Sequence, residues 1–240
     1  DVLSSQSTVA GYKAVLLGAA ELGKFLPMLT TAAGNIQPAR VFVIGAGVSG
    51  LQAVATARRL GGVVSAFDVR PAAREHILSL GATFVATDAV SATAETKAGY
   101  AREQTVEERA RTLAAIATHI KDVDLVITTA NIPGKPSPRL IGADVVRTMR
   151  PGAVIVDLAA ENGGNCELTK ANETVHAHRV TILGPVDLAS TVPFHASQMF
   201  GRNVLALLQH LINKEGTLVI DPNDEITGAM LMTHEGKVLR

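Results

Sequence analysis

Three glycines and one carboxylate carry the strongest chemical pattern in the sequence. Gly45, Gly47 and Gly50 follow an apolar run at residues 41–44, and Asp68 closes the next apolar run. In a turn of this spacing the first glycine permits the tight turn, the second makes room for a pyrophosphate, and the third lets the helix pack closely on the sheet. N–H groups at the start of that helix attract phosphate. The pattern therefore predicts a dinucleotide-binding turn.

Asp68 and Arg70 stand where the two nicotinamide coenzymes are distinguished. A carboxylate at the carboxyl end of the second strand accepts hydrogen bonds from the adenosine ribose hydroxyls and repels a 2′-phosphate. Arg70 leaves the alternative open, because an NADP site uses a nearby guanidinium. Asp68 comes first and takes the ribose position, so the residues favour NAD(H) as the cofactor. Arg70 is either a nucleotide contact or a solvated residue that opens the next helix.

The charge balance and the cysteine content exclude several classes of function. Lys and Arg total 22, Asp and Glu total 22, and the net charge is zero. Such a chain provides no field that gathers nucleic acid or anionic lipid, so we expect no nucleic-acid partner. The one cysteine, Cys166, excludes an internal disulfide and a multi-thiolate metal site. We expect a free thiol in a reducing compartment and no metal.

The hydropathy pattern predicts no membrane span. No apolar run approaches the roughly 18–20 residues that a membrane helix needs. The chain begins at Asp1, without a methionine and without a basic-then-apolar leader, and passes directly into a helical pattern. This start indicates a processed or truncated product of a larger protein.

Strands and helices alternate along most of the chain, which predicts a doubly wound α/β fold with a parallel sheet. The predicted strands are residues 41–44, 63–68, 83–85, 124–129, 153–158 and 180–183. The predicted helices are residues 2–25, 51–60, 71–80, a segment from a Thr105–Glu108 capping box to about Ile120, one ending near Met149, and 195–212. Residues 34–38 are expected to be a link, and residues 217–220 and 226–233 a small β appendage. Residues 87–104 have no clear periodicity.

The alternation also suggests how the chain is divided. An N-terminal helical segment (1–34) precedes a Rossmann-type nucleotide-binding domain (35–195). A C-terminal helix with a β appendage (196–240) then belongs to an incomplete second domain. These boundaries are expectations from the pattern of elements.

Further polar residues fall where predicted strands end, and open α/β sheets bind ligands along that edge. Asp187 comes after the last predicted strand and is a candidate for coenzyme contact. Asp157, Glu161 and Asn162 come at or after the end of the preceding one and could line the nicotinamide side. Two nearby carboxylates need not be an acid/base pair, so we assign none of them a proton-transfer role.

Five stretches together resemble one family. They read DVLSSQSTVAGYKAV, TAAGNIQPARVFVIGAGVSGLQAVATARRLG, AGYAREQ, ITTANIPGKPSPRLI and MRPGAVIVDLAAENGGNCELT. The chain resembles the NAD(H)-binding domain I, or alpha subunit, of proton-translocating NAD(P) transhydrogenase, without its N-terminal subdomain. The glycine pattern is shared with many enzymes, whereas the AGYA and ENGGN stretches are more specific.

The resemblance implies direct hydride transfer between NAD(H) held here and NADP(H) held on a partner component. It also implies a membrane component that carries protons, a homodimer, and a place on the cytoplasmic face of the bacterial inner membrane, with the mitochondrial matrix as the less favoured alternative. Partner subunits would hold this chain at the membrane. Because the N-terminal subdomain is missing, we expect the chain by itself to be incompetent for full turnover.

The resemblance also assigns site residues. Asp1 and Ser4 fall on family positions that contact the nicotinamide and its ribose. Tyr100, with Gly99, falls on a loop that closes over the bound nucleotide in the family. The residues expected to bind the cofactor are Gly45, Ala46, Gly47, Val48, Gly50, Asp68, Val69, Arg70, Gly99, Tyr100, Ala130, Asn131 and Asp187.

Two other functions remain open. An alanine dehydrogenase or a related amino-acid dehydrogenase has a similar nucleotide domain, and its substrate-facing Lys and His would lie in the missing N-terminal region. A non-catalytic module that binds NAD(H) would need no more than the sequence present. The AGYA and GGN segments favour the transhydrogenase.

Overall fold

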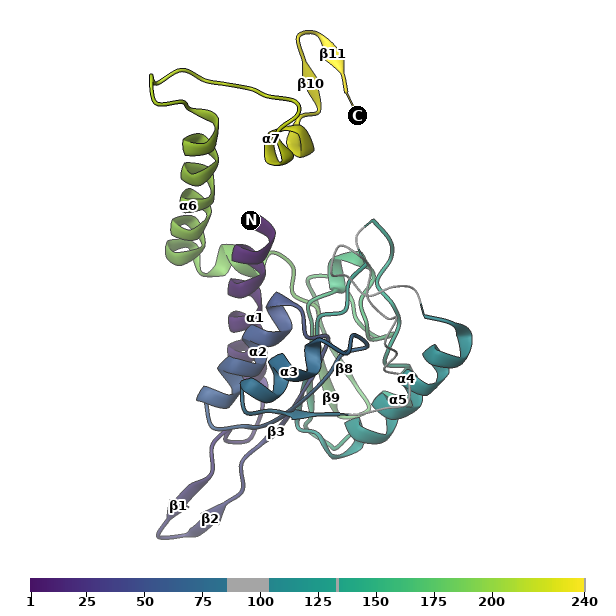
Figure 1. Cartoon of the computed structure of the whole chain (residues 1–240). Helices are drawn as coiled ribbons and strands as arrows, with labels where there is room; N and C mark the ends of the chain where they lie inside the picture. The colour runs from purple at the N-terminus through teal and green to yellow at the C-terminus, as the bar shows by residue number, and fades with distance from the viewer. Residues whose placement is uncertain (86–103, 133, 240) are drawn as a thin grey trace.

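A mostly parallel sheet forms the centre of the computed structural model, which describes residues 1–85, 104–132 and 134–239 (Figure 1). Among these residues the sheet has seven strands, in the order β5 (Thr83–Phe84), β4 (Val63–Phe67), β3 (Arg40–Ile44), β6 (Leu125–Thr128), β7 (Val154–Asp157), β9 (Val180–Leu183) and β8 (Thr174–Ala177). All neighbours pair in parallel except β8, which runs antiparallel to β9. The predicted Rossmann-type doubly wound fold is confirmed.

Helices cover both faces of the sheet, as Figure 1 shows. One face packs against α1 (Val2–Glu21), α2 (Val48–Arg59) and α3 (Ala73–Ser79), and the other against α4 (Val106–His119) and α5 (Ala143–Val146). Each face of the sheet has a hydrophobic core: the first core lies beneath α1, α2 and α3, and the second beneath α4 and α5. Alternate residues of β3 face opposite cores, with Val41 and Val43 in the first and Phe42 and Ile44 in the second. The predicted capping box of α4 is confirmed, with Thr105 at the N-cap and Glu108 three residues on.

The first helix lies against the sheet because glycines let it approach closely. Ala14 and Val15 are fully buried in the first core. A Cβ on Gly11 would lie 2.1 Å from the carbonyl oxygen of Ser49 in α2, and one on Gly18 would lie 2.4 Å from Leu125 in β6. The division of the chain at residues 34 and 195 stays a prediction.

Two segments differ from the sequence expectation. The expected link at residues 34–38 belongs to a β hairpin of β1 (Leu29–Thr31) and β2 (Gly34–Ile36), which projects from the sheet domain in Figure 1. His176, in a stretch for which no strand was expected, lies in β8, and its Nδ1 is 3.2 Å from Thr181 Oγ1. The strands β1, β2 and β8 are short and mostly exposed or half-buried, so hydrophobic periodicity does not reveal them.

The C-terminal region consists of α6 (Pro193–Leu211), α7 (Glu225–Met230), β10 (Thr233–His234) and β11 (Lys237–Val238). The expectation of β structure over residues 226–233 is wrong for most of that range. Asp224 caps α7 by accepting hydrogen bonds from the backbone N–H groups of Ile226 and Thr227. The local capping bonds outweigh the β-branched residue at the start of the segment. Residues 217–220, also expected to be a strand, contribute one isolated bridge, from Leu218 to Ile212.

Candidate coenzyme site

The glycine-rich turn lies at the point where the sheet changes winding direction. β3 and β6 are parallel neighbours, and the chain leaves β3 toward one face and enters β6 from the other. Thr129 follows β6 and its hydroxyl donates to the carbonyl oxygen of Gly45 (3.0 Å). Ala130 comes next, so the loops after β3 and β6 meet here. In open α/β sheets this switch point is where ligands bind.

The three glycines of the turn have different structural reasons to be glycine. Gly45 has φ +97°, and a Cβ there would lie 2.5 Å from Thr129 Oγ1. A Cβ on Gly50 would lie 1.9 Å from the carbonyl oxygen of Gly45, so this glycine allows α2 to approach the strand. A Cβ on Gly47 would meet no atom of the described residues within 4 Å. The fold requires glycine at the first and third positions and leaves open space at the second.

The start of α2 is available to an anion. Gly47 is the N-cap residue, and among the described residues no side chain caps the helix. The first backbone hydrogen bond of this turn runs from Leu51 N–H to Gly47 C=O. The N–H groups of the first turn, beginning at Val48, therefore point into the space above Gly47 without a side-chain acceptor.

Asp68 directly follows β4 and is only 6% exposed. Its Oδ2 accepts from Ala46 N–H (2.7 Å) and from Arg70 Nη2 (2.9 Å). Its Oδ1 accepts from the backbone N–H (2.8 Å) and the Nε (3.0 Å) of Arg70. A carboxylate offers about four acceptor positions, and described residues already use them. A ribose hydroxyl would have to displace a guanidinium bond. Arg70 is an ion-pair partner of Asp68, so the interpretation of Arg70 as a solvated residue is wrong.

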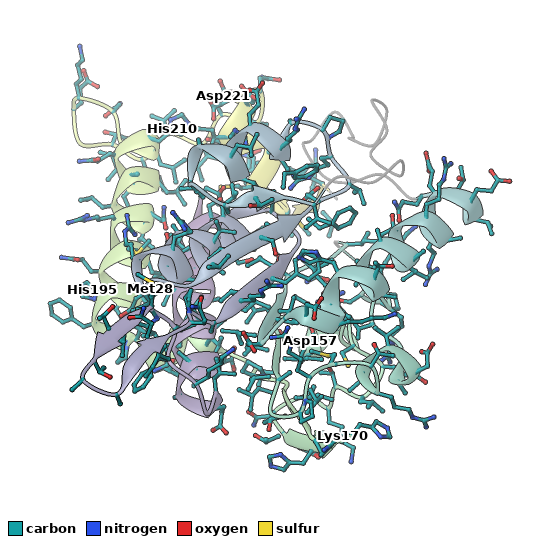
Figure 2. The ribbon with its side chains drawn as sticks, turned by 90° about the horizontal axis from the view of Figure 1, so that it is seen from below. Met28, Asp157, Lys170, His195, His210 and Asp221 are labelled. Carbon is teal, nitrogen blue, oxygen red and sulfur yellow. The ribbon has the colours of Figure 1, made fainter. Side chains whose placement is uncertain are left out.

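A buried carboxylate organises the loops at the carboxyl ends of β6 and β7. Asp157 is fully buried (Figure 2) and accepts hydrogen bonds from the hydroxyls of Thr128 (2.9 Å) and Thr169 (2.7 Å). It also accepts from the backbone N–H groups of Ala159 and Cys166, each at 3.0 Å. With these four donors Asp157 fixes the loop that follows it, and the expectation that it lines the nicotinamide side stays a prediction.

A cleft of about 230 Å³ lies at the same edge of the sheet, between α1 and the loops after β7 and β9. Asp187 lines it and has φ +53°, and Glu161 lines it from the loop after β7. Gln6 and Ser7 of α1 line it as well, and sequence reasoning missed both. Nothing in the local sequence joins positions so far apart.

Comparison with known proteins decides the family. The family model described as alanine dehydrogenase/PNT, C-terminal domain, matches residues 14–240. The chain belongs to this family. It is 46% identical to an NAD(P) transhydrogenase alpha-subunit protein of Rhodospirillum rubrum, over 100% of this chain and 63% of the relative. It is 27% identical to an alanine dehydrogenase of Bilophila wadsworthia, over 99% of this chain and 61% of the relative.

A solved structure gives the same relationship in three dimensions. The crystal structure of a transhydrogenase from Sinorhizobium meliloti superposes with a TM-score of 0.86 at 43% identity, over 100% of this chain and 63% of the other. The present chain therefore spans less than two thirds of the length of these relatives. The expected resemblance to the NAD(H)-binding domain I, or alpha subunit, of NAD(P) transhydrogenase is confirmed.

Asp1 and Ser4, which precede the residues matched by the family model, form the N-terminal cap of α1. Asp1 Oδ1 accepts from Ser4 N–H (3.1 Å), and Asp1 Oδ2 accepts from the Ser4 hydroxyl (2.5 Å). Neither residue lines the cleft, whereas Gln6 and Ser7 of the same helix do. The assignment of Asp1 and Ser4 to the nicotinamide stays a prediction.

The remaining predicted contacts either lie near the switch point or belong to residues that the structure does not describe. Val69 is half-buried beside the second core. Asn131 is exposed, and its Oδ1 accepts from the Ser137 hydroxyl (3.1 Å). Gly99 and Tyr100 lie outside the described residues, so the predicted closing loop stays a prediction.

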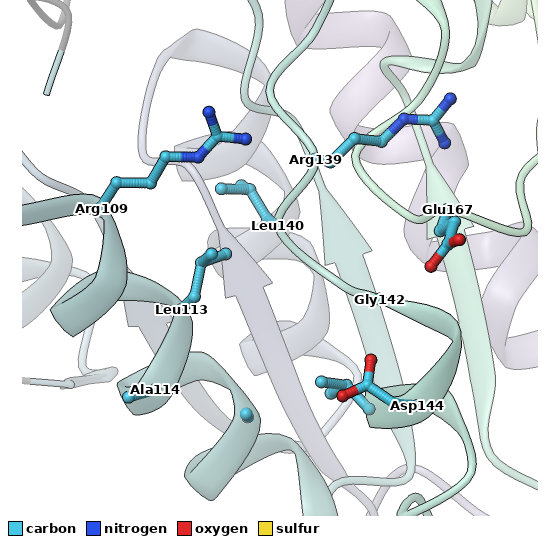
Figure 3. Close-up of a pocket in the computed structure, with 10 residues that line it drawn as sticks. Arg109, Leu113, Ala114, Arg139, Leu140, Gly142, Asp144 and Glu167 are labelled. Carbon is cyan, nitrogen blue, oxygen red and sulfur yellow. The ribbon is translucent and has the colours of Figure 1, made fainter. Parts of the chain in front are cut away.

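A larger cleft, of about 720 Å³, lies elsewhere on the family domain (Figure 3). Arg109 and Leu113 of α4 form one side, and Arg139 and Glu167 belong to the other. None of the predicted coenzyme contacts that the structure describes lines it. The turn at the switch point is therefore the candidate coenzyme site.

Cys166 has no catalytic environment in the domain. It is fully buried, and burial raises the pKa of its thiol, which keeps it protonated.

No group of His, Cys, Asp or Glu side chains among residues 1–85, 104–132 and 134–239 could hold a metal ion. In the same ranges no helix is long and apolar enough to cross a bilayer.

Proposed function

We propose that the chain binds NAD(H) at the β3–α2 turn and serves as the NAD(H)-binding part of a proton-translocating NAD(P) transhydrogenase. The observation that carries the proposal is the open space at Gly47. No atom in the described part of the chain requires a glycine at this position, whereas the fold requires Gly45 and Gly50 to be glycine. A glycine beside an uncapped helix start is accounted for by a ligand whose phosphates approach the backbone.

The relatives support this reaction over the runner-up. The similarity to proteins named NAD(P) transhydrogenase is 46% in identity, against 27% for an alanine dehydrogenase. An alanine dehydrogenase-like enzyme and a non-catalytic NAD(H)-binding module are the alternatives. The nucleotide turn is common to all three, so turnover has to distinguish them.

In the proposed reaction the nicotinamide ring supplies the hydride chemistry when NAD(H) is bound. The residues of this chain bind and orient the coenzyme. The first turn of α2 would hold the pyrophosphate, and Asp68 would hold the adenosine ribose once a guanidinium bond yields. The cleft with Gln6, Ser7 and Asp187 would receive the nicotinamide end. NADP(H) would be bound by a partner component.

The partners and the location belong to the same proposal. A component that holds NADP(H) and a membrane component that conducts protons would complete the enzyme, at the cytoplasmic face of a bacterial inner membrane. A homodimer is proposed because α6 presents exposed apolar side chains, including Phe200, Leu205 and Leu208. Contiguous apolar surface of this kind is typical of an interface.

A pair of glycine variants tests the binding site. For Gly47→Ala we expect an unchanged melting temperature, because the added methyl meets no protein atom, and a Kd for NADH at least about tenfold higher, because it enters the pyrophosphate space. For Gly50→Ala we expect a loss of about 1–3 kcal/mol of stability, because the methyl meets the Gly45 carbonyl. NADH fluorescence titration and thermal unfolding measure the two effects. Unchanged NADH affinity in folded Gly47→Ala would refute the site.

A turnover assay separates the three functions. The full-length protein that contains this chain is mixed with the NADP(H)-binding component, NADH and an oxidised NAD analogue. Cyclic hydride exchange supports the transhydrogenase. NADH oxidation that depends on pyruvate and ammonia would identify an alanine dehydrogenase, and binding without turnover would leave the binding module.

A further inference from the structure

Asn165 is a fully buried amide that pairs with the backbone of a distant loop. Its Oδ1 accepts from the N–H of Ala130 (3.0 Å), and its Nδ2 donates to the C=O of the same residue (2.8 Å). Nδ2 also donates to the C=O of Pro138 (2.9 Å). Backbone groups have fixed donor and acceptor roles, so these partners determine the orientation of the amide.

The same residue holds both ends of the loop after β6. The side chain binds Ala130 at its beginning, and the backbone C=O of Asn165 accepts from the N–H groups of Leu140 (2.8 Å) and Ile141 (3.0 Å) at its end. Residues 130–141 contain no helix or strand in their described part, apart from one isolated bridge at Ile141. The hydrogen bonds of Asn165 therefore hold both ends of a loop that has no regular strand pairing of its own in its described part.

The clamped loop forms one side of the glycine turn. A Cβ on Gly45 would lie 3.2 Å from the backbone nitrogen of Ala130, so the two backbones are in contact. Thr129, the neighbour of Ala130, binds the carbonyl oxygen of Gly45. A displacement of Ala130 would change the width of the space beside the turn.

We propose that Asn165 is a positioning residue for the coenzyme: its buried amide holds the loop after β6 against the glycine turn and thereby sets the affinity for NAD(H). The proposal rests on the function proposed above. Asn165 touches no ligand in it and acts through Ala130. Both amide hydrogens and the amide oxygen are used, so no other side chain of similar size can replace it.

Asn165→Asp in the 240-residue chain tests the clamp with little change of shape. One carboxylate oxygen still accepts from Ala130 N–H, whereas the other, when ionised, faces the carbonyl oxygens of Ala130 and Pro138. Protonation of this buried carboxyl restores a donor. We expect the Kd for NADH to rise about tenfold at pH 8.5 and to recover at least about threefold at pH 6.0.

Two comparisons separate positioning from a loss of fold. The wild type and Asn223→Asp, which adds the same charge at an exposed site, should change their Kd by less than about threefold over the same pH range. Thermal unfolding at both pH values verifies that each variant is folded. An Asn165→Asp protein that is folded and binds NADH like the wild type at both pH values would overturn the proposal.

Hydrogen exchange tests the clamp without coenzyme. In Asn165→Ser we expect the amide of Ala130 to exchange at least about tenfold faster, with the amides of β3 unchanged. Equal rates in variant and wild type would overturn the clamp, even where Asn165→Asp is unfolded at pH 8.5. Failure of the wild type to bind NADH would instead refute the proposed function, and the exchange rates keep the two failures apart.

Discussion

At the scale of single residues, Asp68 and Arg70 form a unit. The guanidinium makes two bonds to the carboxylate, through Nε and Nη2. The ion pair is mostly shielded from solvent, with side chains 7% and 19% exposed. Because Asp68 binds Arg70, the carboxylate offsets the positive charge that a 2′-phosphate would meet in its absence.

Removal of Asp68 should therefore change coenzyme preference. In Asp68→Ala the guanidinium of Arg70 loses its carboxylate partner beside the adenosine ribose, and a 2′-phosphate is a suitable replacement. We expect the ratio of the Kd values for NADH and NADPH to shift by at least about tenfold toward NADPH. Calorimetric titration with both coenzymes measures the ratio.

The double variant Asp68→Ala with Arg70→Ala provides the control. It removes both the ribose acceptor and the cation, so we expect it to bind either coenzyme weakly. If Asp68→Ala discriminates against NADPH as strongly as the wild type does, Arg70 has no part in the choice.

Sequence pattern predicted only the local part of the residue-scale site. The glycine spacing and the acidic residue after β4 depend on short-range geometry, so they could be found without a structure. The occupation of Asp68 by Ala46 and the pairing of Asn165 with Ala130 join positions 22 and 35 residues apart. No rule of spacing connects an amide to a loop that far away.

At the scale of elements, α1 shows how small residues set the distance between helices. Gly11 lies where α1 meets the start of α2, against the carbonyl oxygen of Ser49. Gly201, within α6, has no atom within 4 Å of a built Cβ. Close packing therefore requires a glycine at position 11 of α1, whereas no described contact requires one at position 201 of α6.

Alanine at these two positions should act in opposite directions. Gly11→Ala should lose about 1–3 kcal/mol of stability, because the methyl forces α1 away from α2. Gly201→Ala should gain about 0.5–1 kcal/mol, because alanine favours the helix and meets nothing. Urea unfolding of both variants gives the values. Equal effects at both sites would show that α1 does not pack on α2 as described.

The type of an element could be predicted where a continuous apolar run or a capping box marked it in the sequence. The buried strands β3, β6 and β7 are continuous apolar runs, and the capping box of α4 is visible in the sequence. The hairpin of β1 and β2 has three residues in each strand, too few to show an alternation. In α7 the cap formed by Asp224 starts the helix, and the six residues of the helix are too few to show a clear helical period.

At the scale of the whole molecule, the alternation of strands and helices predicted a doubly wound sheet. The position of β3 beside β6 follows the strand order of this fold, so the binding edge could be located before the structure. The antiparallel edge strand β8 could not be predicted, because it occupies the place of a crossover helix and its residues are polar and half exposed.

The bare backbone at Gly47 also has a consequence in a living cell. Chaperones and proteases recognise the unfolded population of a protein. A chain with one extra methyl group at this position should fold normally, because the methyl meets no described atom within 4 Å. If the proposed function holds, such a chain would accumulate at ordinary abundance and bind NAD(H) weakly. A screen that measures only expression would not detect this loss of binding.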